Sequence, residues 1–149
     1  MSVNSPNLFV GTYEPHEIVI FYKAGEVMEE MMLVKMDSDG KLKKAITGET
    51  PFGFVTQDVT LTGITDQTAI NGLISRVAAV NAYVGLYMGT GVLKTDKYYE
   101  TSGSIAAGDL LYPHASGGYI CNSQQGSDSP VGVADAAASG GVIRFKSLV

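Results

Sequence analysis

A short pattern of residues occurs twice in this chain and constrains its fold more than any other feature. TPFGFV stands at residues 50–55, and SPVGVA stands at residues 129–134. The same features precede both motifs in the same order. Before the first motif stand Ala24-Gly25-Glu26, then Gly40 with Leu42, then Gly48. Before the second stand Ala107-Gly108-Asp109, then Gly118 with Ile120, then Gly126. The shared order predicts two copies of one supersecondary unit, over about residues 24–58 and 107–146.

The paired glycines predict tight turns at matching places in the two copies. We expect Gly25 and Gly108 to take a positive φ at a turn, after which an apolar strand begins. DSDG at residues 37–40 and SGG at residues 116–118 are hairpin signals, with Gly40 and Gly118 supplying the turn conformation.

Each copy also has a proline two residues before a glycine. Proline has no N–H, so Pro51 and Pro130 are expected at the start of a strand or on a sheet edge. Gly53 and Gly132 then allow a close backbone approach or a bulge as the strand bends. Because two copies are too few for a solenoid, the sequence predicts one small all-β barrel or sandwich built from two pseudo-repeated halves.

Alternating and β-branched runs predict further strands. EIVIFY at 17–22 and the closing GVIRF at 141–145 are expected to be strands. Residues 73–88 read as one or two strands, with a helix beginning near Asp66 as the alternative. Propensity favours a helix over 25–36. The equivalent stretch of the second copy, GDLLYPHAS, contains Pro113 and cannot continue a helix, so we expect a strand around Met31 to Met36. The methionines there are expected to fill the core or an interface.

Composition agrees with many short strands and limits the partners. Glycine makes up 18 of the 149 residues, and the formal net charge is −5. Only Lys41, Lys43 and Lys44 cluster among the basic residues, which favours a solvated hairpin edge over a nucleic-acid site.

The single Cys121 and the lack of a secretory leader predict synthesis in a reducing cytoplasm. The most apolar window is too short to span a membrane, so neither a nucleic-acid nor a membrane partner is expected.

Residues suited to catalysis or metal binding are sparse. His16 and His114 both follow a proline, and we expect both in surface turns. A thiol and base pair of Cys121 and His114 lacks an orienting third group, and Cys121 is expected to be a buried strand residue. DSDG begins like a calcium loop, but Gly48 stands where the bidentate glutamate belongs. The sequence therefore predicts no enzyme, no cofactor and no metal site.

Long stretches of the chain resemble a known family. AGEVMEEMMLVKMDSDGKLKKAITGETPFGFVTQDV, a central RVAAV, and AAGDLLYPHASGGYICNSQQGSDSPVGVADAAASGGVIRF are similar to the capsid cement, or head decoration, proteins of tailed bacteriophages. The similarity covers about residues 20–149, apart from an unmatched insert at 59–75. It implies an SH3-like or β-tulip-like fold with an N-terminal arm over 1–20 and one domain over 21–149. It further implies a virion protein that binds the major capsid protein on the outer surface of the expanded head as a homotrimer.

Two sets of residues are candidates for such binding. In an extended arm, Phe9 and Tyr13 share one side and Leu8 and Val10 share the other, which suits an anchor on the capsid; a frayed terminus is the alternative. The tyrosines of the middle region are candidates for the contact between copies, with core packing as the alternative: Tyr83, Tyr87, Tyr98 and Tyr99. A second function, a virion surface or fibre module that binds a host carbohydrate receptor, stays open.

Overall fold

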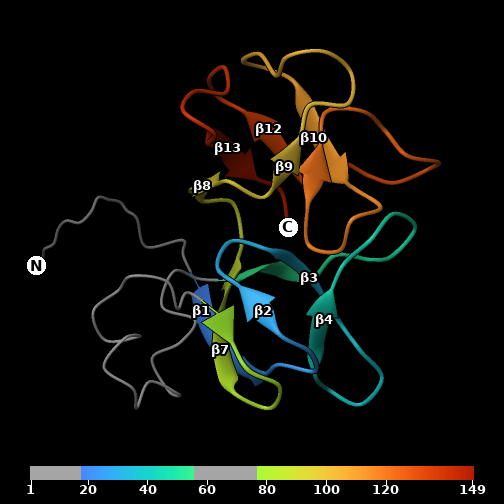
Figure 1. The fold of residues 1–149 in the computed structure, drawn as a ribbon, viewed down its shortest axis with the longest axis vertical. Helices are drawn as coiled ribbons and strands as arrows, with labels where there is room; N and C mark the ends of the chain where they lie inside the picture. Colours follow the sequence, from blue (N-terminus) through green and yellow to red (C-terminus); the bar gives the residue numbers. More distant parts are fainter. Residues whose placement is uncertain (1–17, 56–76) are drawn as a thin grey trace, which may run out of the picture.

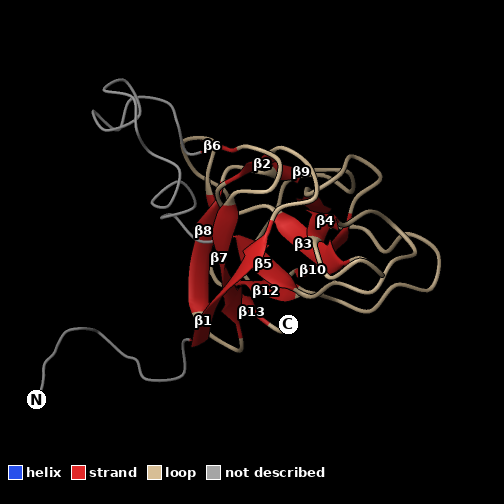
Figure 2. Cartoon of the chain, turned by 90° about the horizontal axis from the view of Figure 1, so that it is seen from below, coloured by secondary structure: helices blue, strands red, loops and turns tan. Residues whose placement is uncertain are grey.

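The described part of the chain folds into β-sheets and contains no helix. The structure is a computed structural model, and it describes residues 18–55 and 77–149. Figure 2 shows strands joined by loops and turns throughout these residues. The all-β prediction is therefore confirmed, and two sheets hold most of the strands. Residues 1–17 of the expected arm and the whole insert at 59–75 lie outside the described residues.

The first sheet is formed by strands within residues 18–55 and 77–88, which we call the first half. Its strand order is β1-β7-β5-β3-β4, and all neighbouring strands are antiparallel. The strands are β1 (Ile18–Lys23), β3 (Leu33–Met36), β4 (Leu42–Lys44), β5 (Gly53–Val55) and β7 (Tyr83–Met88). A short ladder of β2 (Met28–Glu29) and β6 (Val77–Ala78) completes the first half.

The second sheet is formed by residues 89–149, which we call the second half. Its strand order is β8-β13-β12-β10-β11-β9, and only the β9–β11 pair is parallel. The strands are β8 (Val92–Thr95), β9 (Tyr98–Tyr99), β10 (Leu110–Pro113), β11 (Ile120–Cys121), β12 (Gly132–Ala134) and β13 (Ile143–Ser147).

The two sheets have the same connectivity. In the first, β3 pairs with β4 and β5, and β5 continues to β7 and β1; in the second, β10 pairs with β11 and β12, and β12 continues to β13 and β8. Backbone hydrogen bonds outside the ladders repeat as well. Phe52 N–H donates to Val34 O, and Val131 N–H donates to Leu111 O, both at 2.7 Å. The sequence repeat therefore corresponds to one structural unit used twice.

The halves lie one above the other in Figure 1. The strand registers and the burial show that they stack in the same orientation rather than face to face. A cross-strand row in the first sheet runs from Leu33 through Phe54 to Tyr87. The equivalent row in the second sheet consists of Leu110, Val133 and Lys146. Leu33 and Phe54 are buried in a core cluster shared with the second half, whereas Leu110 is 43% exposed. The first half therefore packs against the second half with the sheet face whose equivalent in the second half is exposed.

Two core clusters follow from this stacking. The shared cluster joins both sheets, and within it the ring centroids of Phe54 and Phe145 lie 5.1 Å apart. The other cluster belongs to the first half and includes Met28 and Met32. Because Met31 is buried in the shared cluster, the prediction that methionines fill the core is confirmed for these three. Burial of such side chains is the main driving force for folding.

Most of the predicted turn and strand-start positions are confirmed. Gly40 and Gly118 have φ values of 79° and 86°. β5 and β12 begin two residues after Pro51 and Pro130. A Cβ on Gly53 would lie 2.5 Å from Tyr87 O, and one on Gly132 would lie 2.7 Å from Phe145 Cδ2. Both glycines therefore mark the close approaches that the sequence predicts.

The prediction of a positive φ at Gly25 is wrong, although Gly108 has one of 91°. The residue equivalent to Gly108 is Met31, which has a φ of 60°. Met31 N–H donates to Val55 O at 2.8 Å, and Gly108 N–H donates to Ala134 O at 2.7 Å. Gly25 serves a close approach instead, since a Cβ there would lie 3.0 Å from Leu42 O. The repeated Ala-Gly-acid triplet therefore occupies different places in the two halves.

The other strand predictions are confirmed with shifted bounds. β1 begins at Ile18, so the last residues of the expected arm belong to the sheet. The strand expected around Met31 to Met36 is β3, which begins at Leu33. Residues 77–88 form two strands, separated by a turn in which Asn81 has a φ of 69°. The closing strand β13 starts at Ile143 and runs on to Ser147.

Candidate binding surfaces

The outer face of the second sheet carries two cross-strand rows of side chains, which we call the open face. The first row crosses β10, β12, β13 and β8: Leu110, Val133, Lys146 and Val92. Val92 is 58% exposed. The second row consists of Asp135, Arg144 and Lys94, joined by the Asp135 N–H to Arg144 O bond of 3.0 Å and the Arg144–Lys94 pair.

The open face follows from strict alternation along its strands. In β13 the burial alternates residue by residue, with Ile143 and Phe145 in the core and Arg144 and Lys146 exposed. β8 alternates in the same way, which places Leu93 in the core. Successive side chains of a strand point to opposite faces, so each cation on these strands points away from the shared cluster.

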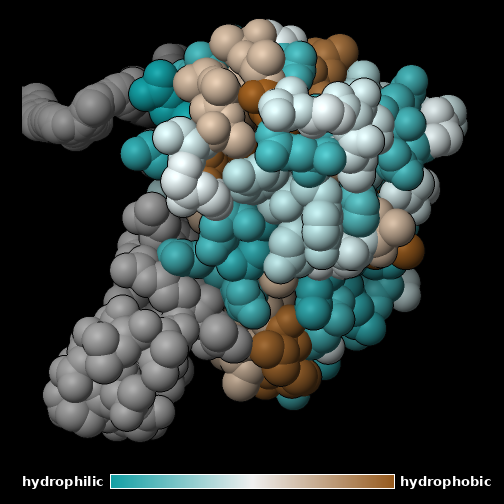
Figure 3. All heavy atoms as spheres, turned by 45° about the horizontal axis from the view of Figure 1, so that its top comes forward, coloured by the Kyte–Doolittle hydropathy of each residue, from teal (hydrophilic) through white to brown (hydrophobic). Residues whose placement is uncertain are grey.

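Positive charge dominates this face although the chain is acidic. Arg144 Nε donates to Asp135 Oδ1 at 2.7 Å, whereas Lys94 and Lys146 have no ion-pair partner among residues 18–55 and 77–149. Lys94 lies directly opposite Arg144 in the ladder, and like charges in that position destabilise a sheet. Figure 3, with the top of Figure 1 turned forward, shows apolar atoms only as separate groups among polar ones.

Backbone and carboxylate hydrogen bonds join the two halves. Leu33 N–H donates to Gly118 O, and Gly118 N–H donates to Ala45 O, both at 2.9 Å. Gly48 N–H in the first half donates to the two carboxylate oxygens of Asp128 in the second, at 3.0 and 3.1 Å. Together with the shared core cluster, these contacts hold the open face on a single packed body.

Lys97 is a nearly buried cation at the junction of the halves. Its side chain is 10% exposed, and its Nζ lies 3.0 Å from Glu29 Oε1 and 2.8 Å from Asp96 Oδ1. Desolvation disfavours the charge, but the hydrogen bonds to Asp96 and Glu29 outweigh it and raise the pKa of Lys97 above its ordinary value. Lys97 is therefore charged at neutral pH and links β2 of the first half to the second half.

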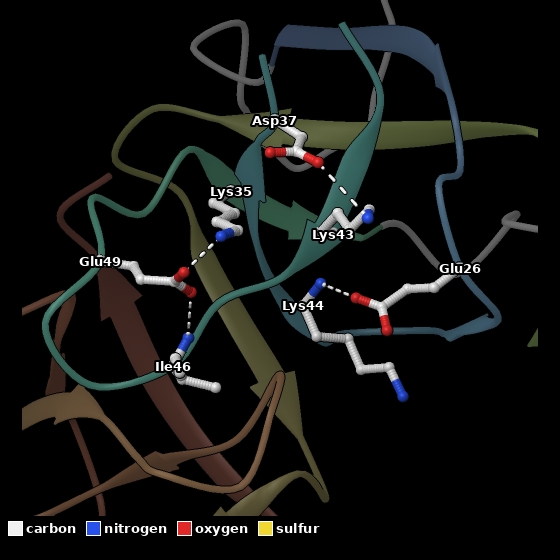
Figure 4. A network of polar contacts seen from close by, with 7 residues as sticks. All are labelled: Glu26, Lys35, Asp37, Lys43, Lys44, Ile46 and Glu49. Atoms are coloured by element: carbon white, nitrogen blue, oxygen red, sulfur yellow. Dashed lines mark hydrogen bonds and ion pairs between the residues drawn. The ribbon is translucent and has the colours of Figure 1, made fainter. Parts of the chain in front are cut away.

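The basic hairpin around β4 is engaged in local contacts, which Figure 4 shows. Lys35 pairs with Glu49, and Lys43 Nζ lies 3.4 Å from Asp37 Oδ2. The backbone N–H of Lys44 donates to a glutamate of the first half, Glu26, at 2.7 Å. β4 is the last strand of the first sheet. Lys41, Lys43 and Lys44 thus lie on a hairpin edge of the sheet, where Lys43 is ion-paired to Asp37.

These contacts shift the pKa values of the hairpin groups. Burial disfavours the charged form of Glu49, but the Lys35 ammonium and the Ile46 N–H, which donates to Glu49 Oε1 at 3.0 Å, hold its pKa below the ordinary value. The bond to Glu49 raises the pKa of Lys35. The backbone N–H of Ser38 and then the Lys43 ammonium lower the pKa of Asp37. Each shift favours the charged form.

The four candidate interface tyrosines fall into two environments. Tyr87 and Tyr98 pack against the shared core cluster, which agrees with the core-packing alternative for these two. Tyr83 is 48% exposed at the start of β7, and Tyr99 is 43% exposed on β9. A contact between copies through Tyr83 or Tyr99 stays a prediction.

His114 and Cys121 make separate contacts at the β10–β11 hairpin. Cys121 is buried in its strand, as expected, and its thiol donates to Ser123 O at 3.2 Å. His114 is half-buried; its Nδ1 accepts the Ser116 N–H at 3.0 Å, and its ring centroid lies 4.4 Å from that of Tyr99. Neither group therefore uses the other as a hydrogen-bond partner.

The described residues offer neither a metal-binding cluster nor a membrane-spanning helix. No group of three or more histidine, cysteine or acidic side chains is placed to hold a metal ion within residues 18–55 and 77–149. The same ranges contain no helix that is long and apolar enough to cross a bilayer. The candidate arm residues Leu8, Phe9, Val10 and Tyr13, together with His16, lie outside the described residues, so their roles stay predictions.

Comparisons with known proteins relate the fold to a phage structure. No protein-family model matches the sequence, and no curated protein matches it. Among solved structures, the chain is similar to the N base of the head fiber protein gp8.5 of bacteriophage phi29, with a TM-score of 0.53 and 13% sequence identity. The alignment covers 88% of this chain and 93% of that one. At this identity the likeness shows a shared fold.

Sequence reasoning missed the open face and its cations. The alternation in VLKT and IRFKS places Lys94, Arg144 and Lys146 opposite the apolar residues of their strands. That pattern could have marked the three as outward-facing. It does not reveal that β8 and β13, far apart in the sequence, are neighbours.

Proposed function

We propose that this chain is a structural virion protein of a bacteriophage, which binds the outer surface of the expanded head and stabilises it by bridging capsid subunits. The observation that carries the proposal is the fold that 88% of the chain shares with the base of a phage head fiber. The motif resemblance to capsid cement proteins, which rests on different evidence, points to the same class of proteins.

The charge and the construction of the molecule suit this role. A net charge of −5 disfavours contact with packaged DNA and suits an outer surface. The two halves share one core cluster and are joined by Lys97 and Asp128, so force applied at one end of the molecule is carried to the other. Several weak contacts made by such a body become strong together, because later contacts are effectively intramolecular.

The partners we propose are the major capsid protein and further copies of this chain in a homotrimer. The N-terminal arm supplies an anchor, with Phe9 and Tyr13 on one side of an extended segment. The exposed Tyr83 and Tyr99 are candidates for contacts between copies. We expect this role to need no catalysis, cofactor, nucleic acid or membrane.

The test mixes the purified chain with expanded, undecorated heads of the phage that encodes it. We expect saturable binding near one copy per capsid subunit, with heads that withstand a higher temperature. Sedimentation gives the stoichiometry, and release of packaged DNA on heating gives the stability. Absence of binding would contradict the proposal.

The arm has its own test. Deleting residues 2–14 should abolish binding to heads while the thermal unfolding of the remaining chain stays unchanged. Unchanged binding by the deletion variant would show that the arm is not the anchor.

A receptor-binding role is the second candidate, and one observation favours it. Tyr99 is exposed on the edge strand β9 and packs against two rings of the second half. The centroid of its ring lies 4.4 Å from that of His114 and 5.0 Å from that of Tyr119. An ordered, exposed aromatic side chain offers an amphipathic surface for a sugar at little entropic cost. In that role the chain would occupy a few sites per virion, bind host glycans and leave head stability unchanged.

A further inference from the structure

The open face is the counterpart of a surface that already forms an interface inside the molecule. Its row Leu110–Val133–Lys146 occupies the positions that Leu33, Phe54 and Tyr87 occupy in the first half. There, Leu33 and Phe54 are 0% and 1% exposed because they pack against the second half. The same sheet position is thus used for packing in one half and is uncovered by any described residue in the other.

Two apolar side chains of the open face are exposed. Leu110 and Val92 are 43% and 58% exposed at the two ends of the row. Val133 lies next to Leu110, and Lys146 lies next to Val92. A lysine stem can cover apolar surface while its ammonium stays in water. The row therefore offers a strip of three apolar side chains, on β10, β12 and β8, which Lys146 on β13 interrupts.

The cations distinguish the open face from its counterpart. By strand register, Lys146 takes the place of Tyr87, and Arg144 takes the place of Gly85. Lys94 lies opposite Arg144, which costs stability, and Arg144 is the one cation of the three with an ion-pair partner, Asp135, among the described residues. A face selected for solubility alone would alternate charges. An acidic partner would instead turn the like-charge arrangement into a favourable one.

Two other occupants fit the open face less well. A second copy cannot extend the stack in the same way, because the surface it would need in the first half is already filled: Met28, Val34 and Leu42 are 0% exposed. Nucleic acid presents phosphates, which pair with cations, but its backbone offers no apolar surface to pack against the exposed Leu110 and Val92.

We propose that the open face is a docking site for an acidic protein surface with an apolar strip, bound through Lys94, Arg144 and Lys146 around Leu110, Val133 and Val92. If the proposed function holds, on which the identity of the partner rests, that surface belongs to the major capsid protein. The apolar strip supplies the buried contact, and the cations set orientation and partner choice.

A charge-reversal pair tests the site. Lys94→Glu/Lys146→Glu changes the two cations that have no ion-pair partner among the described residues and leaves the Arg144–Asp135 pair in place. The matched control is Lys23→Glu/Lys41→Glu in the first half, with the same change in net charge. We expect the test pair to weaken binding to expanded heads at least about tenfold at low salt, and the control pair to bind within about twofold of the unchanged chain. Lys94→Arg/Lys146→Arg should retain binding.

A second measurement is independent of the heads. Polyglutamate, a carboxylate peptide probe, should shift the amide NMR signals of residues 92–95, 133–135 and 143–147 in the full chain, and the shifts should shrink with added salt. Shifts spread over the lysines 41–44 instead, or none, would overturn the docking site. Tighter binding of duplex DNA to the same amides would assign the face to nucleic acid and overturn it as well.

The two measurements separate this inference from the proposed function. If heads do not bind the unchanged chain but polyglutamate shifts the open face, the capsid role fails and the acidic docking site stands. If heads bind the test pair, the control pair and the unchanged chain equally, the capsid role stands and the docking site is wrong.

Discussion

The two halves of this chain use one structural unit in opposite ways. In the first half, the row of Leu33, Phe54 and Tyr87 is packed into the shared core cluster. In the second half, the equivalent Leu110 and Lys146 face outward. Because connectivity and register are the same, the two rows do not differ in local structure or strand pairing. They differ in whether another part of the molecule covers them. Two sheets stacked in one orientation leave one outer face at each end; the β2–β6 ladder covers the outer face of the first sheet, and no described residue covers that of the second.

The first half closes its own core, and the second half does not. Met28 and Ala78 on the β2–β6 ladder complete the cluster beside the first sheet. The second sheet instead depends on Leu33 and Phe54 from the first half to cover Phe145. The stability of the second half is therefore tied to the first, and four predictions test or sharpen this asymmetry.

Phe54→Ala and Val133→Ala alter equivalent positions in the two rows. Phe54→Ala removes a buried ring from the shared cluster, and we expect a loss of about 3–5 kcal/mol in the free energy of unfolding. Val133→Ala should cost less than about 1 kcal/mol, because the side chain is only half-buried on the open face. Urea denaturation measures both losses, provided that the dependence of the unfolding free energy on urea concentration is the same for the variants and the wild type. Equal losses at the two positions would show that the halves do not stack as described.

Gly53→Ala and Gly132→Ala test the shared close approach. A Cβ at Gly53 meets the backbone oxygen of Tyr87, and a Cβ at Gly132 meets the ring of Phe145. Both changes should cost about 1–3 kcal/mol, with the larger loss at Gly53 because a backbone atom cannot rotate away. Denaturation midpoints give the values. An unchanged stability on substitution of either glycine would show that the glycine is not needed for the close approach.

Gly108→Met tests the assignment of Gly108 as the equivalent of Met31. Nothing lies within 4 Å of a Cβ built on Gly108, so the expected cost is that of a left-handed backbone with a side chain, about 1–2 kcal/mol. Thermal unfolding measures it, with Ala107→Ser as the neighbouring control. A loss that prevents folding would mean that the two turns are not equivalent.

Glu49→Gln has the smallest expected effect and depends on pH. Lys35, the partner of Glu49, is replaced at the equivalent position in the second half by Tyr112, so the ion pair belongs to the first half alone. Because the folded pKa of Glu49 is lowered, its contribution to stability is fully present above its unfolded pKa near 4.5 and is lost as the pH falls through the folded value. The stability difference between wild type and Glu49→Gln should thus shrink between pH 6 and pH 3. A difference that stays constant over this range would show that the pair does not couple to folding.

The sequence predicts the parts of this fold that depend on local chemistry. Pro51 and Pro130, with Gly53 and Gly132, mark equivalent strands because a missing N–H and a missing Cβ each fit few positions in a sheet. Gly40 marks its hairpin for the same kind of reason. These signals act within a few residues, so one copy of the repeat is enough to read them.

The stacking could not be predicted from the sequence because both faces of the first sheet are apolar. Leu33 and Val34 are adjacent and buried in different clusters, so no alternation shows which face meets the second half. Met31 holds a conformation that usually belongs to glycine, which is why the Gly25 triplet suggested the wrong equivalence. The candidate site depends on the register of β8 with β13, which is a long-range property.

The most direct test of the difference between the halves is an amine-labelling footprint of the chain bound to expanded heads. Lys94 and Lys146 on the open face should lose reactivity on binding, while Lys23 and Lys41 in the first half keep theirs. Mass spectrometry of labelled peptides from free and bound chain gives the four ratios in one experiment. Protection of Lys23 and Lys41 with Lys94 and Lys146 still reactive would contradict a docking role for the open face.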